Sequence, residues 1–540
     1  MSVGQPNASC TTERRQDSAT DTNLAGARVP LDVENAPEAE MSAAAEQSVF
    51  TENLSRIQSA PYSTFSRSTR IWVTAMITVG SIISPMTANI YFPAIVSIAK
   101  DLNVTTGLIN LTLTTYMVFQ GLSPPLLGDF GDMAGRRPAY VLAFTVYLAA
   151  NIGLALQRNY AVLMVLRCFQ SAGSSGTLAL GFAVIADLVP RSSRGRYMGI
   201  VGAGINVGPT LGPFLGGLLS QYLGWPALFW FLAIFASVWL IPWILFTPET
   251  CRHVVGNGSL APQKWNAPVM HYITGQKSII GLEPGPRHKL KLPNPLKTLV
   301  LSFEKEMGQI LLIASAIYLC FILVAATLST LFKEIYGYSD LQIGLCYLPY
   351  GVGCCITSVI QGYILDWNYR RIAKKIGFGM NQRSRDDVSK FPIESARIQP
   401  LYPSLLIGGG ALIGYGWALQ VETSVAVPLV LVFIVGMMVP TSFNVLNTLI
   451  IDLFPEAPAT AAAANNLVRC LFGAVATAII DYMLKGMGRG WCFTFLALLM
   501  IASIPWLWLI EKRGPKWRAE KAKRQQDQEL EPSTANTGNK

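Results

Sequence analysis

Twelve apolar stretches, each about as long as a bilayer is thick, dominate this 540-residue chain. A helix of about 20 apolar residues spans the hydrocarbon core, and a segment in lipid must be helical because it cannot leave backbone groups unpaired. Only 14% of the residues are charged, against about 25% in ordinary soluble domains. The sequence therefore predicts an all-α, polytopic membrane protein with twelve transmembrane helices. The stretches lie near residues 71–94, 105–126, 138–156, 161–189, 196–220, 226–247, 308–331, 341–365, 401–420, 424–451, 458–484 and 490–510.

The longest internal interruption divides these stretches six and six. We expect a polar N-terminal tail at residues 1–66, without an apolar signal-peptide segment and without fixed structure. A first six-helix half follows at 67–247 and a central loop at 248–306. The second six-helix half is expected at 307–511, and a basic tail with one short helix at 512–540.

The net charge of +10 follows the expected topology. Basic residues gather in the even-numbered connections and in the C-terminal tail, whereas each odd-numbered connection holds at most one or two. Because basic residues mark cytoplasmic loops, we expect both termini, the central loop and the other even-numbered loops to be cytoplasmic. The membrane is expected to be the plasma membrane, with the vacuolar membrane as an alternative. This placement argues against nucleic acid as a partner, and the cysteines and histidines show no metal-ligand spacing.

Two motifs occur once in each half. GDFGDMAGRRP at 128–138 returns as GYILDWNYRR at 362–371, with the same spacing of glycine, aspartate and paired arginines. DLVP at 187–190 returns as DLFP at 452–455, each time where the fourth helix of its half gives way to the fifth. Together the repeats predict two homologous halves with a site near mid-membrane at their interface.

These motifs resemble those of the major facilitator superfamily over roughly residues 70–511. GDFGDMAGRRP is similar to the family's loop motif between helices 2 and 3, and RCFQSAG, from Arg167, to its fourth-helix motif. GINVGPTLGPFLGG at 204–217 resembles the fifth-helix motif associated with antiporters. SPMTANIYFPA at 84–94 and TPET after the sixth helix resemble the fungal twelve-helix drug:proton antiporters, and the chain also resembles fungal citrate-type exporters. The resemblance implies a secondary transporter rather than an enzyme, energised by the proton gradient without a cofactor.

The loop motif is expected to form a gate at the cytoplasmic membrane edge. A charge pair there can form in one conformation and break in the other, and glycine allows close approach and a tight turn. The alternative for the two arginines is that they only anchor the topology. The predicted gate residues are Gly128, Asp132, Gly135, Arg136, Arg137, Asp366 and Arg370.

Arg167 lies inside the fourth apolar stretch, where an arginine costs at least ~2.5–3.5 kcal/mol at mid-depth. The resemblance implies a part in proton coupling, and Gln170 lies one turn away on the same face. The alternative is an arginine that snorkels to the outer headgroups. Other polar residues in apolar stretches are candidates for substrate or coupling contacts, although each asparagine could instead make an interhelical hydrogen bond: Asn89, Asn206, Asn465 and Arg469.

The fifth stretch carries a glycine every fourth residue, with two prolines between. Such a small face lets a helix press against its neighbour, and the prolines favour a kink. The antiporter resemblance implies that this packing seals the path against leak, and the alternative is helix packing with no such role. The motif residues are Gly204, Gly208, Pro209, Gly212, Pro213, Gly216 and Gly217.

The first and seventh stretches contain no central Asp or Glu, where many drug:proton antiporters carry a carboxylate. The candidate proton carriers are instead Asp132, Asp187, Asp452 and Asp481. We expect a monomer in the bilayer that exports drugs, toxins or secondary metabolites in exchange for protons. The alternative is export of an organic acid such as citrate, with Arg167 and Arg469 as carboxylate contacts. Asn103 begins a possible glycosylation sequon in the short first outer loop.

Overall fold

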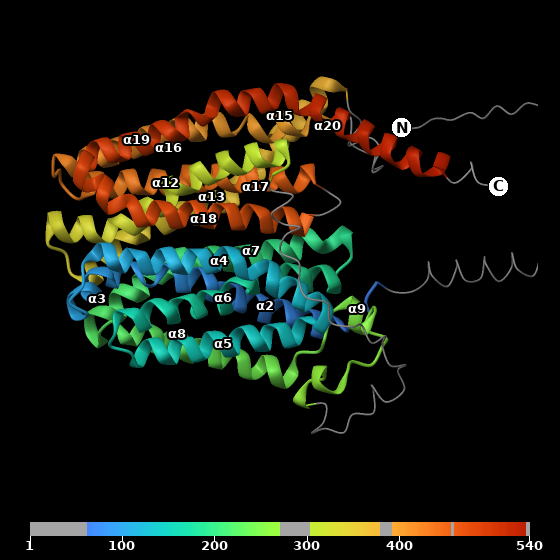
Figure 1. Ribbon diagram of the computed structural model, residues 1–540, viewed down its shortest axis with the longest axis horizontal. Helices are drawn as coiled ribbons and strands as arrows, with labels where there is room; N and C mark the ends of the chain where they lie inside the picture. Colours follow the sequence, from blue (N-terminus) through green and yellow to red (C-terminus); the bar gives the residue numbers. More distant parts are fainter. Residues whose placement is uncertain (1–61, 271–302, 378–390, 455–457, 536–540) are drawn as a thin grey trace, which may run out of the picture. The chain divides into compact units, whose positions relative to one another are not determined.

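The computed structural model describes residues 62–270, 303–377, 391–454 and 458–535. Residues 1–61 of the expected tail and residues 271–302 of the expected central loop lie outside the described residues. The described residues form a bundle of long helices joined by loops, without an extended strand (Figure 1).

Six long helices form the first half, and two short elements connect the first two of them. The chain caps several of these helices locally: Thr105 accepts a hydrogen bond from the backbone N–H of Leu108, and Asn159 accepts one from Ala161. The elements are α2 (Arg67–Asn89), η1 (Phe92–Ala94), α3 (Ile95–Asp101), α4 (Thr106–Ala134), α5 (Arg136–Leu156), α6 (Tyr160–Leu188), α7 (Arg191–Leu223) and α8 (Pro226–Phe246).

The second half repeats this plan, with its last helix in two pieces. A capping box between Ser339 and Gln342 starts its second long helix. Its last helix continues past the expected end of the span to Ala535, so the C-terminal helix is longer than predicted. The elements are α12 (Lys305–Tyr336), α13 (Asp340–Ile376), α15 (Ile393–Ile398), α16 (Leu401–Gln420), α17 (Ala426–Leu453), α18 (Pro458–Met487), α19 (Arg489–Ile501) and α20 (Ser503–Ala535).

Ten of the described helices are long and apolar enough to cross a membrane, with α19 and the start of α20 counted as one. The other two long helices of the bundle are α4 and α16. Polar residues dilute α4, which contains Asn110, Gln120 and Asp129, and glycines dilute α16. With these two, the predicted count of twelve agrees with the fold.

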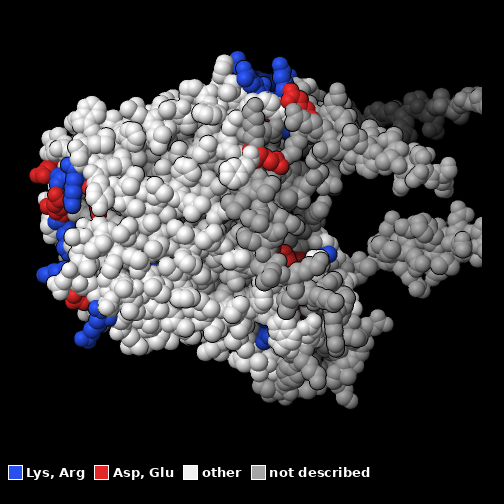
Figure 2. Space-filling view, viewed as in Figure 1, with Lys and Arg blue, Asp and Glu red and all other residues white. Residues whose placement is uncertain are grey.

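The two halves use the same packing scheme. In the first half α5 packs on α6 and α8, and α4 packs on α6; in the second, α16 packs on α17 and α19, and α13 packs on α17. The halves lie side by side and meet mainly along the pairs α7–α13 and α4–α18 (Figure 1). Charged side chains gather toward the two ends of the bundle, and the visible flank between them is nearly free of charge (Figure 2). We call these ends the α3 end and the α9 end, after α3 and the short α9 (Arg252–Val255).

The last residues of the expected N-terminal tail are packed against the α9 end. The guanidinium of Arg252 lies 3.7 Å from the centre of the Tyr62 ring and donates a hydrogen bond to its carbonyl at 2.8 Å. The Tyr62 hydroxyl donates to the carbonyl of Ala186 at 2.8 Å. The prediction of an unstructured tail is therefore wrong for residues 62–66, because polar contacts of the backbone and an aromatic ring hold them.

Candidate substrate cavity and gates

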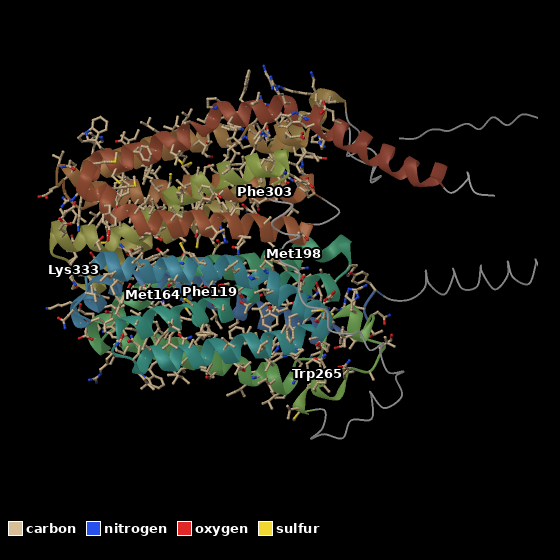
Figure 3. All side chains as sticks on the ribbon, in the orientation of Figure 1. Phe119, Met164, Met198, Trp265, Phe303 and Lys333 are labelled. Carbon is tan, nitrogen blue, oxygen red and sulfur yellow. The ribbon has the colours of Figure 1, made fainter. Side chains whose placement is uncertain are left out.

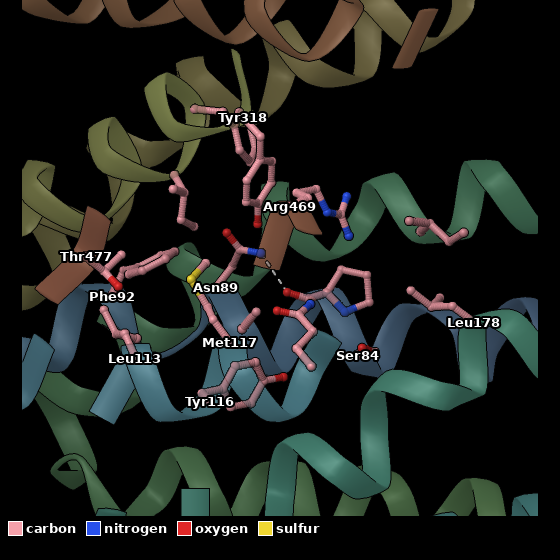
Figure 4. A pocket seen from close by; sticks show the side chains of 16 residues that line it. Ser84, Asn89, Phe92, Leu113, Tyr116, Met117, Leu178, Tyr318, Arg469 and Thr477 are labelled. Atoms are coloured by element: carbon pink, nitrogen blue, oxygen red, sulfur yellow. Dashed lines mark hydrogen bonds between the residues drawn. The ribbon is translucent and has the colours of Figure 1, made fainter. Parts of the chain in front are cut away.

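A cavity of about 190 Å³ lies between the two halves (Figure 4). Helices α2, α4, α6 and α7 of the first half line it with η1, and α12 and α18 of the second half close it. Ligand sites usually measure about 300–1,000 Å³, so in this conformation the cavity holds a small ligand or part of a larger one. Most of its lining is apolar or aromatic: Ser84, Pro85, Ala88, Asn89, Phe92, Leu113, Tyr116, Met117, Gln120, Leu178, Ile205, Tyr318, Phe321, Ile322, Arg469 and Thr477.

Two of the predicted polar residues, Asn89 and Arg469, meet in this cavity. The Asn89 amide donates to the carbonyl of Pro85 in its own helix at 2.7 Å, drawn as a dashed line in Figure 4. The guanidinium of Arg469 donates to Asn466 Oδ1 at 2.5 Å and lies 4.9 Å from the centre of the Tyr318 ring. The cavity therefore combines one cation, amide groups and aromatic faces.

The other two predicted asparagines do not line the cavity. Asn206 donates to the carbonyl of Gly202, four residues earlier in α7, at 3.0 Å. Asn465 donates to Asn447 Oδ1 of α17 at 2.8 Å. Asn465 thus makes the interhelical hydrogen bond that was its alternative role, and the part of both residues in substrate or coupling contacts stays a prediction.

Arg167 is fully buried between two tyrosine rings. Its guanidinium carbon lies 4.2 Å from the centre of the Tyr91 ring and 4.3 Å from that of Tyr116. It donates to Gln170 Oε1 at 2.7 Å, and Gln170 donates to Asn151 Oδ1 of α5 at 2.7 Å. Nε and Nη2 of Arg167 have no hydrogen-bond partner among the described residues. The snorkelling alternative therefore does not hold, because the guanidinium points into the bundle.

Arg167 does not line the cavity itself, but Tyr116 touches both. One face of the tyrosine packs on the guanidinium, and the residue also forms part of the cavity wall. Gln170 lies behind this wall with Arg167 and is fully buried. The two predicted arginines thus occupy different places: Arg469 faces the cavity and Arg167 supports its wall.

GDFGDMAGRRP forms the junction between α4 and α5 at the α9 end. Arg136 pairs with Asp132 at 2.5 Å and with Asp187, at the end of α6, at 3.0 Å. The motif arginine therefore joins three helices of the first half. A charge cluster of this kind suits the predicted gate, because its contacts depend on the relative positions of those helices.

The two glycines of this motif differ in what they allow. Gly135 has a φ of +112°, and a Cβ there would collide with Glu249 Oε2 and with the side-chain amide of Asn266. Only glycine fits this turn without strain. A Cβ on Gly128 would meet no atom of the described residues within 4 Å, so the close approach predicted for Gly128 does not occur among them in this conformation.

Glu249, in TPET after α8, is a buried residue beside the loop motif that motif reasoning did not single out. Its buried carboxylate accepts hydrogen bonds from the backbone N–H groups of Arg136, Arg137, Thr250 and Cys251 at 2.8–3.1 Å. The first two are free donors at the start of α5, where a negative charge is also favoured by the helix dipole. Burial raises the pKa of Glu249, and the four hydrogen bonds act in the opposite direction.

Arg137 is buried and fastens the end of α8 and the loop that follows it. Its guanidinium donates to the carbonyl of Ile244 at 2.7 Å and to that of Trp265 at 3.4 Å. A residue that only anchored the topology would reach into water or headgroups. The structure instead gives Arg137 a specific position in the α9 end of the first half.

The second copy of the loop motif does not form the predicted gate. Asp366 and Arg370 are exposed, and no ion pair joins them within the described part of α13. The cause is at Tyr369, which stands where the first copy has Gly135: without a glycine turn, α13 continues as a helix to Ile376. Asp452, near the end of α17, instead pairs with Arg397 of α15 at 2.9 Å.

The comparisons with known proteins agree with this architecture. The family model described as Major Facilitator Superfamily matches residues 77–477. The chain belongs to the major facilitator superfamily. It is 41% identical to the MFS-type transporter phiD of a fungal species over 86% of this chain and 72% of that protein. It is 37% identical to the MFS-type transporter tstD of Talaromyces stipitatus (86% and 85%) and 35% identical to citrate exporter 1 of Aspergillus niger (86% and 90%).

Solved structures support the same fold. The transporter resembles a D-xylose–proton symporter with a TM-score of 0.60 at 15% identity, covering 81% of this chain and 97% of that one. It also resembles the human organic anion transporter MFSD10, with a TM-score of 0.53 at 19% identity, covering 82% of this chain and all of the other. The chain is thus a multi-pass membrane protein of a family that transports small molecules.

The glycine face of α7 packs closely on α2. A Cβ on Gly204 would approach the carbonyl of Thr78 to 2.8 Å, and one on Gly208 would approach the backbone N of Met86 to 2.6 Å. Gly212 and Gly216 likewise lie against the end of α2, while Gly217 lies against the start of α13 in the other half. The predicted face is therefore in backbone contact with two helices, one of them across the boundary between the halves.

We expect Gly208→Ala to destabilise this transporter, because its new methyl group would collide with backbone atoms of α2 that cannot rotate away. The melting temperature of the purified protein should fall by several degrees. Gly202→Ala on the same helix is the matched control, since a Cβ there meets nothing within 4 Å and alanine favours the helix by up to about 1 kcal/mol. Equal melting temperatures for the two variants would contradict the close packing.

At the α3 end, Asp340 joins the two halves. Its carboxylate accepts hydrogen bonds from Ser97 of α3 at 2.5 Å and from Ser220 of α7 at 2.6 Å, both in the first half. Lys333 of α12 completes the cluster at 3.1 Å from the other oxygen. A second contact across the boundary lies nearby, where Asn110 of α4 donates to Asp481 of α18 at 3.1 Å. These contacts hold the halves together at this end.

Asn103 lies between α3 and α4 at the same end. It is exposed and has a φ of +52°, which asparagine tolerates better than most residues. The hydroxyl of Thr105, the third residue of the sequon, caps α4. Its glycosylation stays a prediction.

Proposed function

We propose that this protein is a secondary active transporter that exports small organic compounds in exchange for protons, as a monomer in the plasma membrane with both termini cytoplasmic. The observation that carries the proposal is a mostly apolar cavity walled by both halves. A site between two such halves can open to one side and then to the other. Relatives named as MFS-type transporters and a citrate exporter support transport of organic compounds. Under this orientation the α3 end faces outward.

Arg167 supports proton coupling through its position. It is a buried cation stacked on a tyrosine of the cavity wall, and two of its nitrogens have no hydrogen-bond partner among the described residues. The electrostatic environment of this guanidinium changes when a nearby group is protonated or moves. It also changes when a substrate contacts Tyr116 and displaces its ring. Arg167 can thereby transmit the state of the cavity to helices α5 and α6.

Among the four candidate carboxylates, Asp481 suits a coupling role best. Asp132 and Asp187 pair with Arg136 inside the first half, and Asp452 pairs with Arg397 inside the second. Asp481 instead bonds to Asn110 across the boundary between the halves. A proton on this carboxylate would therefore act on the contact that alternating access must break.

The outward-facing state requires the Asp340 cluster to separate. We expect Asp340→Ala to raise the population of this state, because it removes two hydrogen bonds between the halves at once. Spin labels on cysteines introduced at the exposed Leu223 and Val421 would report the separation of the halves at the α3 end. Lys333→Gln is the control, since it removes an ion pair within the second half and should shift the distances less. Identical distance distributions in Asp340→Ala and the unmutated protein would contradict this role.

The proposed export is tested in cells that express the chain, with an empty vector for comparison. Cells are loaded with citrate, with a hydrophobic cation such as rhodamine 6G, and with an organic anion such as carboxyfluorescein supplied as its ester. We expect efflux of at least one of these compounds to depend on the chain and to stop with a proton uncoupler. If all three leave at the empty-vector rate, the proposal is wrong.

Export of citrate itself is a second candidate, favoured by Arg469 in the cavity. The two arginines do not face one ligand site in this conformation, however, because Arg167 lies behind the wall made by Tyr116. A tricarboxylate in this cavity would meet one arginine and a largely apolar surface. Citrate therefore fits this conformation less well than a ligand with fewer charges.

A further inference from the structure

We propose that the cavity binds an amphipathic organic anion, with one carboxylate or sulfonate group held by Arg469 and an apolar or aromatic body packed on the rest of the wall. This inference rests on the proposed function and names the substrate class of the same site. It concerns a ligand intermediate between the two expected classes, which were hydrophobic drugs and small polyacids such as citrate.

The charge of the cavity wall is the first argument. Arg469 is the charged residue among the sixteen that line the cavity, and neither Asp nor Glu is among them. Arg469 forms no ion pair with any described residue, and its buried Nε has no hydrogen-bond partner. Arg469 is partly buried; arginine stays protonated in proteins, and a charge that has lost part of its water costs free energy unless it is paired. An anionic ligand would supply the missing partner.

The contacts that Arg469 already makes place its charge without neutralising it. Tyr318 and Phe443 each lie 4.9 Å from the guanidinium carbon, and Asn466 accepts one hydrogen bond. Aromatic faces and a neutral amide stabilise a cation only in part. They hold the planar guanidinium in one orientation, and its fork of donors suits a carboxylate or sulfonate.

The rest of the wall selects an apolar body. Figure 4 shows Arg469, Tyr318 and Asn89 at one side of the cavity, with Met117, Leu113 and Phe92 along the remaining wall. The amides of Asn89 and Gln120 can orient a polar substituent but carry no charge. One cation matches one anionic group, and an apolar surface favours a body that leaves water.

A hydrophobic cation would be disfavoured here. It would meet Arg469 in a space whose described lining residues include no carboxylate to offset the repulsion, and like charges in such a site cost more than in water. The inference also fits the chain's lack of a central Asp or Glu in its first and seventh helices, since an anionic ligand needs no acidic partner.

The matched probes are naphthalene-2-sulfonate, its neutral sulfonamide, a naphthyltrimethylammonium ion and citrate. Binding of each is measured by isothermal titration calorimetry on the purified full-length protein. Arg469→Gln removes the charge, Arg469→Lys keeps it, and Arg158→Gln is the control because Arg158 is exposed at the α3 end. Size-exclusion chromatography and melting temperature check that each variant is folded.

We expect naphthalene-2-sulfonate to bind more tightly than the sulfonamide, the ammonium ion and citrate. Arg469→Gln should weaken sulfonate binding by about 10- to 100-fold, as loss of a charge-assisted hydrogen bond predicts, and leave the weaker sulfonamide binding unchanged. Arg469→Lys should restore part of the affinity and Arg158→Gln should change nothing. The inference is overturned if the ammonium ion or the sulfonamide binds as tightly as the sulfonate or more tightly, or if citrate binds more tightly than the sulfonate. It is also overturned if the sulfonate binds Arg469→Gln as tightly as the unmutated protein, or if the sulfonate does not bind at all. In the cell assay, chain-dependent export of rhodamine 6G, a hydrophobic cation, would overturn it and leave the proposed function standing.

Discussion

Replacing Arg167 by glutamine should reduce uphill transport to the empty-vector level while leaving the protein in the membrane. The guanidinium is enclosed by the rings of Tyr91 and Tyr116 and bonded to Gln170. Glutamine keeps a polar group of moderate size but removes the charge and the stacking surface. If this cation couples the cavity wall to the packing of α6 on α5, its loss should remove coupling before it removes folding. The measurement is uncoupler-sensitive efflux together with the amount of protein at the membrane.

Two further variants separate a coupling role from a packing role. Arg167→Lys keeps the charge but has no planar group to stack between the rings, so we expect reduced, still uncoupler-sensitive efflux. Asn151→Ala removes the far end of the hydrogen-bonded chain through Gln170 and should have a smaller effect than Arg167→Gln. Full uphill transport by Arg167→Gln would contradict the role assigned to this residue.

Glu249→Gln should lower the stability of the α9 end by about 2–4 kcal/mol, because it removes the negative charge and one of the two acceptor oxygens of a buried carboxylate that accepts four backbone hydrogen bonds. Glutamine has one acceptor oxygen, and its NH2 group would face N–H donors. The helix dipole of α5 would also lose its negative partner. The melting temperature of the purified protein should fall by several degrees.

The control for Glu249 is Glu422→Gln at the α3 end. Glu422 is largely exposed and pairs with Arg489 at 3.2 Å, so its loss should change stability by less than about 1 kcal/mol. The pair of variants tests whether burial and backbone contacts, rather than the charge alone, give Glu249 its importance. A melting temperature for Glu249→Gln within a degree of the control would show that the α5 N-terminus does not depend on it.

Hydropathy predicted the bundle well because a segment in lipid has few ways to satisfy its backbone. The stretch at 105–126 illustrates this: α4 forms there and extends to Ala134 even though its polar residues dilute its hydropathy. Helix ends outside the apolar region were less predictable: α20 continues to Ala535 although Gly514 and Pro515, which usually end a helix, lie inside it. Residues 62–66 are held by contacts with segments far away in the sequence, such as Arg252, which composition cannot reveal.

The repeated motifs predicted where the charged residues lie in the fold, but not which residues they contact. Arg136 pairs with Asp132 because the chain turns at Gly135. The corresponding residues Asp366 and Arg370 form no ion pair with each other in the described part of the chain, because Tyr369 replaces that glycine and the helix continues. Asn89 and Arg469 were assigned to a common site by residue type alone, and the cavity joins them.

Residues whose role depends on tertiary contacts were missed. Glu249 acts through backbone groups brought from another helix, and Tyr116 acts through its contact with Arg167. The sequence offered two signals: Glu249 directly follows an apolar stretch, and Tyr116 lies within one. Neither signal identifies a partner, so sequence periodicity could not assign these roles.

The most direct test of the central claim uses the purified protein in proteoliposomes. Vesicles are loaded with naphthalene-2-sulfonate, which never accepts a proton near neutral pH, and with a pH-sensitive dye, while potassium and valinomycin clamp the voltage. If the transporter exchanges an organic anion for protons, efflux of the sulfonate should acidify the interior, and vesicles with Arg167→Gln should show no acidification. Efflux of the sulfonate at an unchanged internal pH would contradict proton exchange.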